Sequence, residues 1–300
     1  ALRGHDERQE ATNRGNFLEL CDLLARYDEV FAKKLSGSFS LTGHVTQNKL
    51  SEIAADIVKS NIIEKVQENV FFTILVDEAR SFKQEQMTVC VRYTENLEIK
   101  ERFLGFVDCF KRGDADAIYQ NIKQFLELSG IANIPIVAQC YDGVAVMAGH
   151  INEVQQKILQ DYPTECNCRF SSQSMKVAKS VDAVLKCDSE GINELLSKYG
   201  STLPINPKLS YTEMELIKID FLKKEITPES LKGAASTKFY PDFTKLLKLA
   251  LTSPVGTATC VRSFSAMQRI HNWLRSTMGQ ERTWALCLLH IESDIARDIN

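Results

Sequence analysis

The sequence contains no apolar run of the ~18 residues that a membrane-spanning helix needs. The first ten residues, ALRGHDERQE, are polar and lack the hydrophobic segment of a signal peptide. An excess of basic charge is also missing, because 36 Lys and Arg face 39 Asp and Glu, for a formal net charge of −3. Non-specific nucleic-acid binding usually rests on such an excess. We therefore expect an intracellular protein with no membrane contact, whose DNA contacts, if any, come from a local patch or another domain.

A disulfide framework is equally absent. The nine cysteines are odd in number and scattered, and several sit inside apolar runs, as Cys90 does in MTVCVRY. This pattern indicates buried thiols in a reducing compartment. Cys166 and Cys168 suggest a zinc ligand pair, but structural zinc sites usually need a second pair, and none lies nearby.

What is present is a globular composition. The chain has 300 residues, of which 44% are hydrophobic and 25% charged, enough for a sizeable core. Short, β-branched apolar runs predict strands at 70–77, 87–94, 99–110 and 134–141, and helical spacing predicts helices at 114–130 and 144–160. Three strands joined by short turns form an antiparallel meander, and a helical crossover returns the fourth in parallel. This order predicts an α/β fold with an RNase H-like mixed sheet.

Helices flank this core in the sequence. Residues 16–35 place apolar side chains on one helical stripe, and residues 46–68 do the same with Ile53, Ile57, Ile62 and Val66. Helices are also expected from about Ser174, at 209–225 and at 241–253. Two amphipathic segments, 263–277 and 281–299, predict a C-terminal helical hairpin whose apolar side must be buried.

Three blocks of the sequence resemble hAT-type transposases, in particular the zinc finger MYM-type and related hAT-derived proteins. They are ALRGHDE with NRGNFLEL, then ILVDEA through QCYDGVAVMAGHINEVQQKI, and finally TSPVGTATCVRSFSAMQRIHNWLRSTMGQER. The resemblance implies four regions. They are a helical region at 1–68, the first part of an RNase H-like core at 69–160, a shortened helical insertion at 161–250, and a hAT C-terminal dimerisation region at 251–300 that completes the core.

The resemblance further implies a degenerate DDE site. Transposases of this kind hold two divalent metal ions, usually Mg²⁺ or Mn²⁺, with three carboxylates. Asp77 and Asp142, at the ends of neighbouring strands, match the first two, and Val261 stands where the family places the glutamate. Because an isopropyl group has no oxygen to bind a metal, we expect no catalysis and no cofactor. We also expect Asp77 and Asp142 to be vestigial ligands.

Plainer interpretations stay open for each of these residues. Asp77 could cap a strand or pair with Arg80, and Asp142 with Gly143 is an ordinary turn dipeptide. A competing hypothesis is a surviving metal-dependent nuclease or strand-transferase, in which Glu78 or Glu281 replaces the missing ligand.

The C-terminal hairpin supplies the remaining candidates. For dimerisation, with itself or with a related hAT-derived protein, we expect a seam of Phe264, Leu274, Trp284, Leu288 and Ile291, although the same stripe could simply be core. Arg262, Arg269 and Arg275 could contact DNA phosphates or form a solvated helix face. By resemblance, DNA recognition belongs to a separate zinc-binding domain, and the protein is expected in the nucleus.

Overall fold

The computed structural model describes residues 15–37, 41–81, 84–108, 115–142, 154, 156–158, 160–162, 166–167, 172–189, 191–200, 203–220, 226–253, 258–270 and 278–299. At its centre is a mixed sheet in the order β3-β2-β1-β4-β5. Its strands are β1 (Phe72–Ser81), β2 (Gln84–Glu95), β3 (Glu98–Asp108), β4 (Ile136–Asp142) and β5 (Cys166–Asn167). β1 pairs antiparallel with β2 and parallel with β4, and β5 is parallel to β4. This is the predicted RNase H-like arrangement, with β5 as a strand that the sequence pattern did not indicate.

The β2–β3 hairpin turns at Asn96 and Leu97, both of which have positive φ, 51° and 61°. Two consecutive residues of this kind form the tight turn whose twist suits a hairpin. The turn therefore lies between the predicted strands 87–94 and 99–110, as expected. A positive φ is unfavourable for leucine. Burial of the Leu97 side chain, which is only 7% exposed, offsets that cost.

Helix α4 (Ala115–Leu128) provides the crossover from β3 to β4. It buries Ile118, Ile122 and Leu126 at helical spacing. It ends at Leu128, two residues before Gly130, where φ is +72°. The helix predicted at 144–160 lies partly outside the described residues; residues 154, 156–158, 160 and 161 are helical. Gly130 confirms the helix end expected from the sequence, because glycine adopts this conformation without steric cost.

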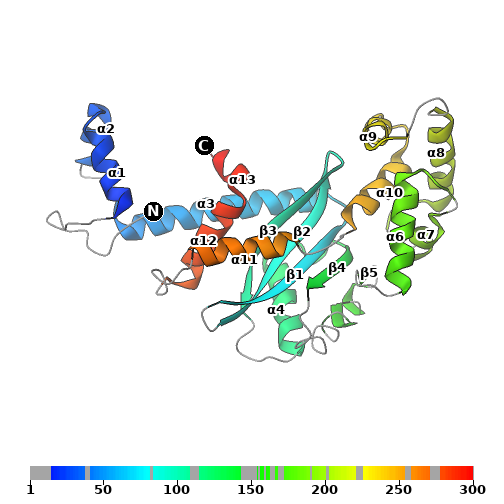
Figure 1. The fold of residues 1–300 in the computed structure, drawn as a ribbon, viewed down its shortest axis with the longest axis horizontal. Coiled ribbons are helices and arrows are strands. Elements are labelled where there is room, and N and C mark those ends of the chain that lie inside the picture. Colours follow the sequence, from blue (N-terminus) through cyan, green and yellow to red (C-terminus); the bar gives the residue numbers. More distant parts are fainter. Residues whose placement is uncertain are drawn as a thin grey trace.

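The N-terminal region contains α1 (Asn16–Ala25), α2 (Glu29–Leu35) and α3 (His44–Gln67). The single stripe expected at 16–35 is wrong in one respect, because the helix breaks before Asp28. The Asp28 carboxylate accepts hydrogen bonds from the Val30 and Phe31 amides at 2.9 and 3.0 Å and starts α2. Figure 1 shows α1 and α2 projecting from one end of the molecule, beyond the start of α3.

A helical insertion lies between β5 and the last helices: α6 (Ser172–Leu185), α7 (Asn193–Tyr199), α8 (Pro207–Asp220), α9 (Pro228–Ser236) and α10 (Pro241–Thr252). These helices gather at the end of the molecule opposite α1 and α2 (Figure 1). They enclose a second apolar core, which includes Tyr199, Met214 and Phe243. The Tyr199 hydroxyl donates to the Val137 carbonyl at 2.8 Å and thereby fastens the insertion to β4.

The chain ends with α11 (Ala258–Ile270), α12 (Gln280–Ile291) and α13 (Ser293–Arg297). The predicted hairpin is present, but its second arm is interrupted at Glu292. The Glu292 carboxylate accepts from the backbone amide of Phe103 at 2.6 Å and from Arg102 at 2.8 Å. Because β3 is an edge strand, this contact satisfies an amide that the sheet itself leaves unpaired. Among the described residues, no helix is long and apolar enough to cross a membrane.

Candidate functional site

The candidate site begins with two aspartates on adjacent parallel strands. Asp77 of β1 and Asp142 of β4 are Cα partners in the strand register. Asp142 is the last residue of β4, as expected, but Asp77 is not at the end of its strand. β1 continues to Ser81, because residues 78–81 still pair with residues 84–87 of β2. Asp77 is 9% exposed, and the side chain of Asp142 lies outside the described residues.

Helix α11 crosses the same part of the sheet. Cys260 is fully buried on its inner side, and Ser263 Oγ lies 3.9 Å from Cys90 Sγ of β2. A hydrogen bond with Cys90, burial and the Asp77 carboxylate raise the pKa of the Cys260 thiol above its usual range. The first turns of α11 therefore pack against β2 beside Cys90, and the helix also contacts β1, the strand that carries Asp77.

Val261 follows Cys260 directly and is 47% exposed. Successive residues on a helix point about 100° apart, so Val261 lies on the outer flank of the turn whose inner side, at Cys260, is buried against the sheet. Glu281, one of the two substitutes considered for the missing carboxylate, is exposed in the first turn of α12. The other, Glu78, pairs with Met87 through its backbone in β1, and its side chain lies outside the described residues.

A buried polar network, which the sequence analysis did not predict, fixes α11 and α10 to the sheet. Arg92 of β2 donates to the Leu251 carbonyl through Nε and Nη2 at 3.1 and 2.8 Å, and to Glu101 of β3 at 2.8 Å. Glu101 in turn accepts from the Thr259 hydroxyl of α11. Arg92 and Glu101 each lie inside a predicted apolar strand, and a charged residue in such a strand indicates a buried partner. The two residues are in fact register partners in β2 and β3.

The arginines considered for DNA contact occupy the outer side of α11. Arg262 and Arg269 are exposed. Arg262 also donates to the Thr259 hydroxyl at 2.8 Å, and Arg269 to the Ser265 carbonyl at 3.2 Å. Arg275 lies outside the described residues.

Two residues of the predicted dimerisation seam lie in the core of their own chain, which is the alternative interpretation of that stripe. Phe264 is 6% exposed and Leu288 is fully buried, and both belong to the core of the sheet domain. They pack within their own chain and leave no surface for a partner. Trp284 and Ile291 are only partly buried, but Trp284 donates to the Leu104 carbonyl at 3.2 Å. Leu274 lies outside the described residues.

The predicted buried thiols are confirmed where they are described. Six of the described cysteines are buried thiols that form no disulfide: Cys21, Cys90, Cys140, Cys187, Cys260 and Cys287. The side chains of Cys166 and Cys168 lie outside the described residues. Within the described part, no group of three or more His, Cys, Asp or Glu side chains is placed to hold a metal ion.

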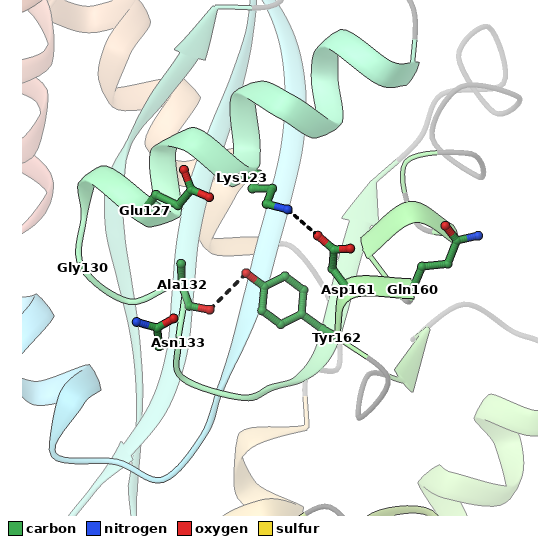
Figure 2. Close-up of a pocket in the computed structure, with 8 residues that line it drawn as sticks. All are labelled: Lys123, Glu127, Gly130, Ala132, Asn133, Gln160, Asp161 and Tyr162. Carbon is green, nitrogen blue, oxygen red and sulfur yellow. Dashed lines mark hydrogen bonds and ion pairs between the residues drawn. The ribbon is translucent and has the colours of Figure 1, made fainter.

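A polar groove of about 690 Å³ lies beside the C-terminal half of α4 (Figure 2). There Lys123 of α4 contacts Asp161 at 2.7 Å, and the Tyr162 hydroxyl donates to the Ala132 carbonyl at 3.2 Å. The lysine and Tyr119 hydrogen bonds hold the pKa of the Asp161 carboxyl below its usual range. These contacts tie the residues before β5 to α4, and none of them involves Asp77 or α11.

Comparison with known families agrees with this architecture. Residues 1–153, about half of the chain, match the family described as ZMYM1/FAM200, RNase-like domain. Residues 211–295 match the hAT family C-terminal dimerisation region, which covers α11 and α12 and begins within the helical insertion. The chain therefore belongs to the ZMYM1/FAM200 RNase-like family and is a hAT-transposase-derived protein that carries the hAT C-terminal dimerisation region.

Proposed function

We propose that this chain is a catalytically silent transposase derivative that works as a dimer, in the nucleus. The observation that carries the proposal is Val261. The resemblance implies that the third carboxylate of the DDE site stood there, in the first turn of α11, a helix that contacts strand β1, which carries Asp77. An aliphatic side chain at this place can neither bind a metal ion nor act as an acid or base.

The chemistry makes the loss severe. Phosphoryl transfer by this type of site depends on metal ions that stabilise both the attacking and the leaving oxygen. Hard cations such as Mg²⁺ need several oxygen ligands in near-octahedral geometry. Two carboxylate positions and an isopropyl group do not fit that requirement. We therefore assign no cofactor to the chain, and Asp77 and Asp142 are vestigial ligands.

Dimerisation is the activity that remains. It is supported by the match of residues 211–295 to the hAT dimerisation region. The partner is a second copy or a related hAT-derived protein. Because the chain as a whole carries no basic excess, any DNA contact is local and falls to the exposed Arg262 and Arg269 of α11.

One observation favours the competing function, a metal-dependent nuclease or strand-transferase. Asp77 and Asp142 are still Cα partners, as a working site would require. Such an enzyme needs a substitute third ligand, and Glu78 and Glu281 are the candidates.

A nicking assay on supercoiled DNA separates the two functions. The chain is incubated with Mg²⁺ and with Mn²⁺, beside an Asp142→Ala variant. We expect no metal-dependent cleavage above the level of the variant. Cleavage by the wild-type chain that Asp142→Ala abolishes would overturn the proposal and identify an active nuclease.

A further inference from the structure

Helix α8 of the insertion has an inner face in the second core and an outer face in solvent. The inner face packs against α10 and buries side chains at helical spacing, namely Ser210, Glu213, Met214 and Ile217. The outer face carries four exposed residues, Leu209, Thr212, Leu216 and Ile219. Its three aliphatic side chains are 48%, 47% and 59% exposed, in chain order. Figure 1 shows α8 at the outer edge of the insertion, with α10 between it and the sheet.

The outer residues of α8 follow a heptad spacing. Leu209 and Leu216 are seven residues apart, and Thr212 and Ile219 each follow one of them after three residues. Because residues three and four apart are neighbours on a helix, these four side chains form one continuous, narrow stripe. A stripe of this width is the seam through which two helices pack side by side. The occupant that fits the outer face of α8 is therefore another helix.

Most of this stripe lies within residues 211–295, the part of the chain that matches the hAT dimerisation region. Among the described residues of that region, the large apolar side chains that are exposed are Leu216, Ile219, Phe239 and Val261. Phe239 directly precedes Tyr240, whose hydroxyl donates to Asp220, the last residue of α8. The exposed apolar side chains of α1, α2 and α3 lie outside the matched region. Within the described part of the dimerisation region, apolar exposure is therefore concentrated at α8.

The stripe is complementary to itself when two copies of α8 run antiparallel. A two-fold axis through the middle of the helix brings Leu209 of one copy level with Ile219 of the other, and Thr212 level with Leu216. The exposed charges at the two ends then match as well, because Lys208 comes level with Asp220 of the second copy. A parallel pair would instead bring like charges level with each other. Charges beside an apolar seam set the orientation of paired helices, and here they favour the antiparallel pair.

We infer that the outer face of α8 is the dimer seam and that its occupant is the same face of a second copy, in an antiparallel pair. The inference rests on the proposed dimerisation and assigns it to α8 rather than to the stripe of the C-terminal hairpin. A seam of this length is smaller than the ~800 Å² per partner of a standard interface. The dimer is accordingly a weak, reversible one, with a dissociation constant in the micromolar range.

Sedimentation velocity across a concentration series tests the inference on the whole chain. The variant Leu216→Glu/Ile219→Glu places two like charges in the seam of each copy and should raise the dimer dissociation constant at least tenfold. The matched control is Ile53→Glu/Ile57→Glu on α3, where the exposed fractions are 46% and 47% and which lies outside the matched region. The control should dimerise like the wild type.

A single charge reversal tests the orientation. Lys208→Glu faces Asp220 of the second copy in the antiparallel pair and should raise the dissociation constant severalfold at low salt, with a smaller effect at high salt. In a parallel pair the same substitution exchanges one repulsion between like charges for another and changes little. An unchanged dissociation constant would therefore refute the antiparallel arrangement.

The remaining outcomes separate the two proposals. A wild-type chain that stays monomeric at every concentration refutes the proposed dimerisation and this inference with it. A dimer that the α8 variant leaves intact, or that the α3 control weakens equally, refutes only the assignment of the seam to α8. If circular dichroism shows that the α8 variant is misfolded, Thr212→Arg, at an exposed polar position in the same stripe, replaces it with the same expectation.

Discussion

Asp77 of β1 and Asp142 of β4 sit side by side as Cα partners in a parallel pair of strands. Neighbouring strands lie about 4.8 Å apart, so the two positions stand close enough to share one cation. Helix α11 contacts β1 beside this pair, with Cys260 buried on its inner side and the next residue, Val261, 47% exposed. The backbone therefore brings two carboxylate positions together, and under the proposed function residue 261 decides whether they bind a metal ion.

Restoring that side chain gives the first prediction. Val261→Glu should raise the affinity for Mn²⁺ at least tenfold over the wild type in isothermal titration calorimetry, because it returns the missing oxygen ligand. Val261 is 47% exposed, so the substitution should change the free energy of unfolding by less than about 0.5 kcal/mol. Val261→Gln is the control, since it has the same length without the charge. Equal Mn²⁺ affinity in the two variants would show that residue 261 does not face the aspartates.

The second prediction concerns the arginine that joins the sheet to α10. Arg92→Lys should lower the free energy of unfolding by about 1–3 kcal/mol in urea titrations, because one ammonium cannot replace three guanidinium hydrogen bonds and leaves a buried acceptor unsatisfied. Arg297→Lys is the control, on an exposed position of α13 away from this network, and should change stability by less than about 0.5 kcal/mol. Equal effects of the two variants would contradict the network as a fixed link between α10 and the sheet.

Sequence patterns predicted the sheet because its strands are short apolar runs with distinct borders. β1, β2, β3 and β4 all lie within a few residues of their predicted places. β5 could not be found this way, since two residues carry no periodicity and depend on β4 for their hydrogen bonds. β1 was expected to end at Asp77 because apolar character ends there, yet hairpin pairing with β2 carries the strand on to Ser81.

Sequence patterns could not predict which apolar helix faces are buried in the core of the same chain. An apolar stripe indicates that one face of a helix must be covered, but it does not indicate which element or partner covers it. The stripe of α12 was assigned to a partner, and Leu288 is instead fully buried in its own chain. On α3, Ile53 and Ile57 were expected to face the same side as Ile62, and they are 46% and 47% exposed while Ile62 is buried. Which apolar face meets the core depends on tertiary packing, which periodicity does not contain.

The third prediction tests the link between edge strand β3 and the C-terminal helices. Glu292→Ala should destabilise the chain by about 3–5 kcal/mol, because it leaves the mostly buried Arg102 without its partner. Asp294, which also contacts Arg102 at 2.7 Å, keeps the loss toward the lower end of that range. Glu292→Gln retains an oxygen acceptor for the Phe103 amide and should cost less. Thermal or urea unfolding measures both, and equal losses would mean that the amide contact adds nothing.

The same carboxylate predicts a pH dependence. Burial raises the pKa of Glu292 above its ordinary value of 4.5, in spite of the bonds from Phe103 and Arg102. The folded state therefore holds this proton more tightly than the unfolded state does. Linkage then makes the wild type lose stability, relative to Glu292→Gln, as the pH rises from about 4.5 through the raised pKa. Urea titrations of both proteins between acidic and neutral pH should show that the stability advantage of the wild type over Glu292→Gln shrinks as the pH rises. A constant or growing advantage would contradict the prediction.

The last prediction concerns Gly105 of β3, where α4 and α12 approach the sheet closely. A Cβ atom at this position would lie 3.0 Å from Phe125 Cε2 and 3.0 Å from Trp284 Nε1. Neither ring is free to move aside, because Trp284 donates to the Leu104 carbonyl at 3.2 Å and Lys59 Nζ lies over both rings, 5.0 and 5.8 Å from their centroids.

Gly105→Ala should therefore destabilise the chain by about 1–3 kcal/mol, the usual cost of overpacking. Gly233→Ala in α9 is the matched control, since a Cβ there meets nothing within 4 Å and alanine favours a helix interior over glycine by up to about 1 kcal/mol. The two identical substitutions should shift the melting temperature in opposite directions. A neutral Gly105→Ala would show that the Phe125 and Trp284 rings can yield, and that α12 is held against β3 by the Glu292 contacts instead.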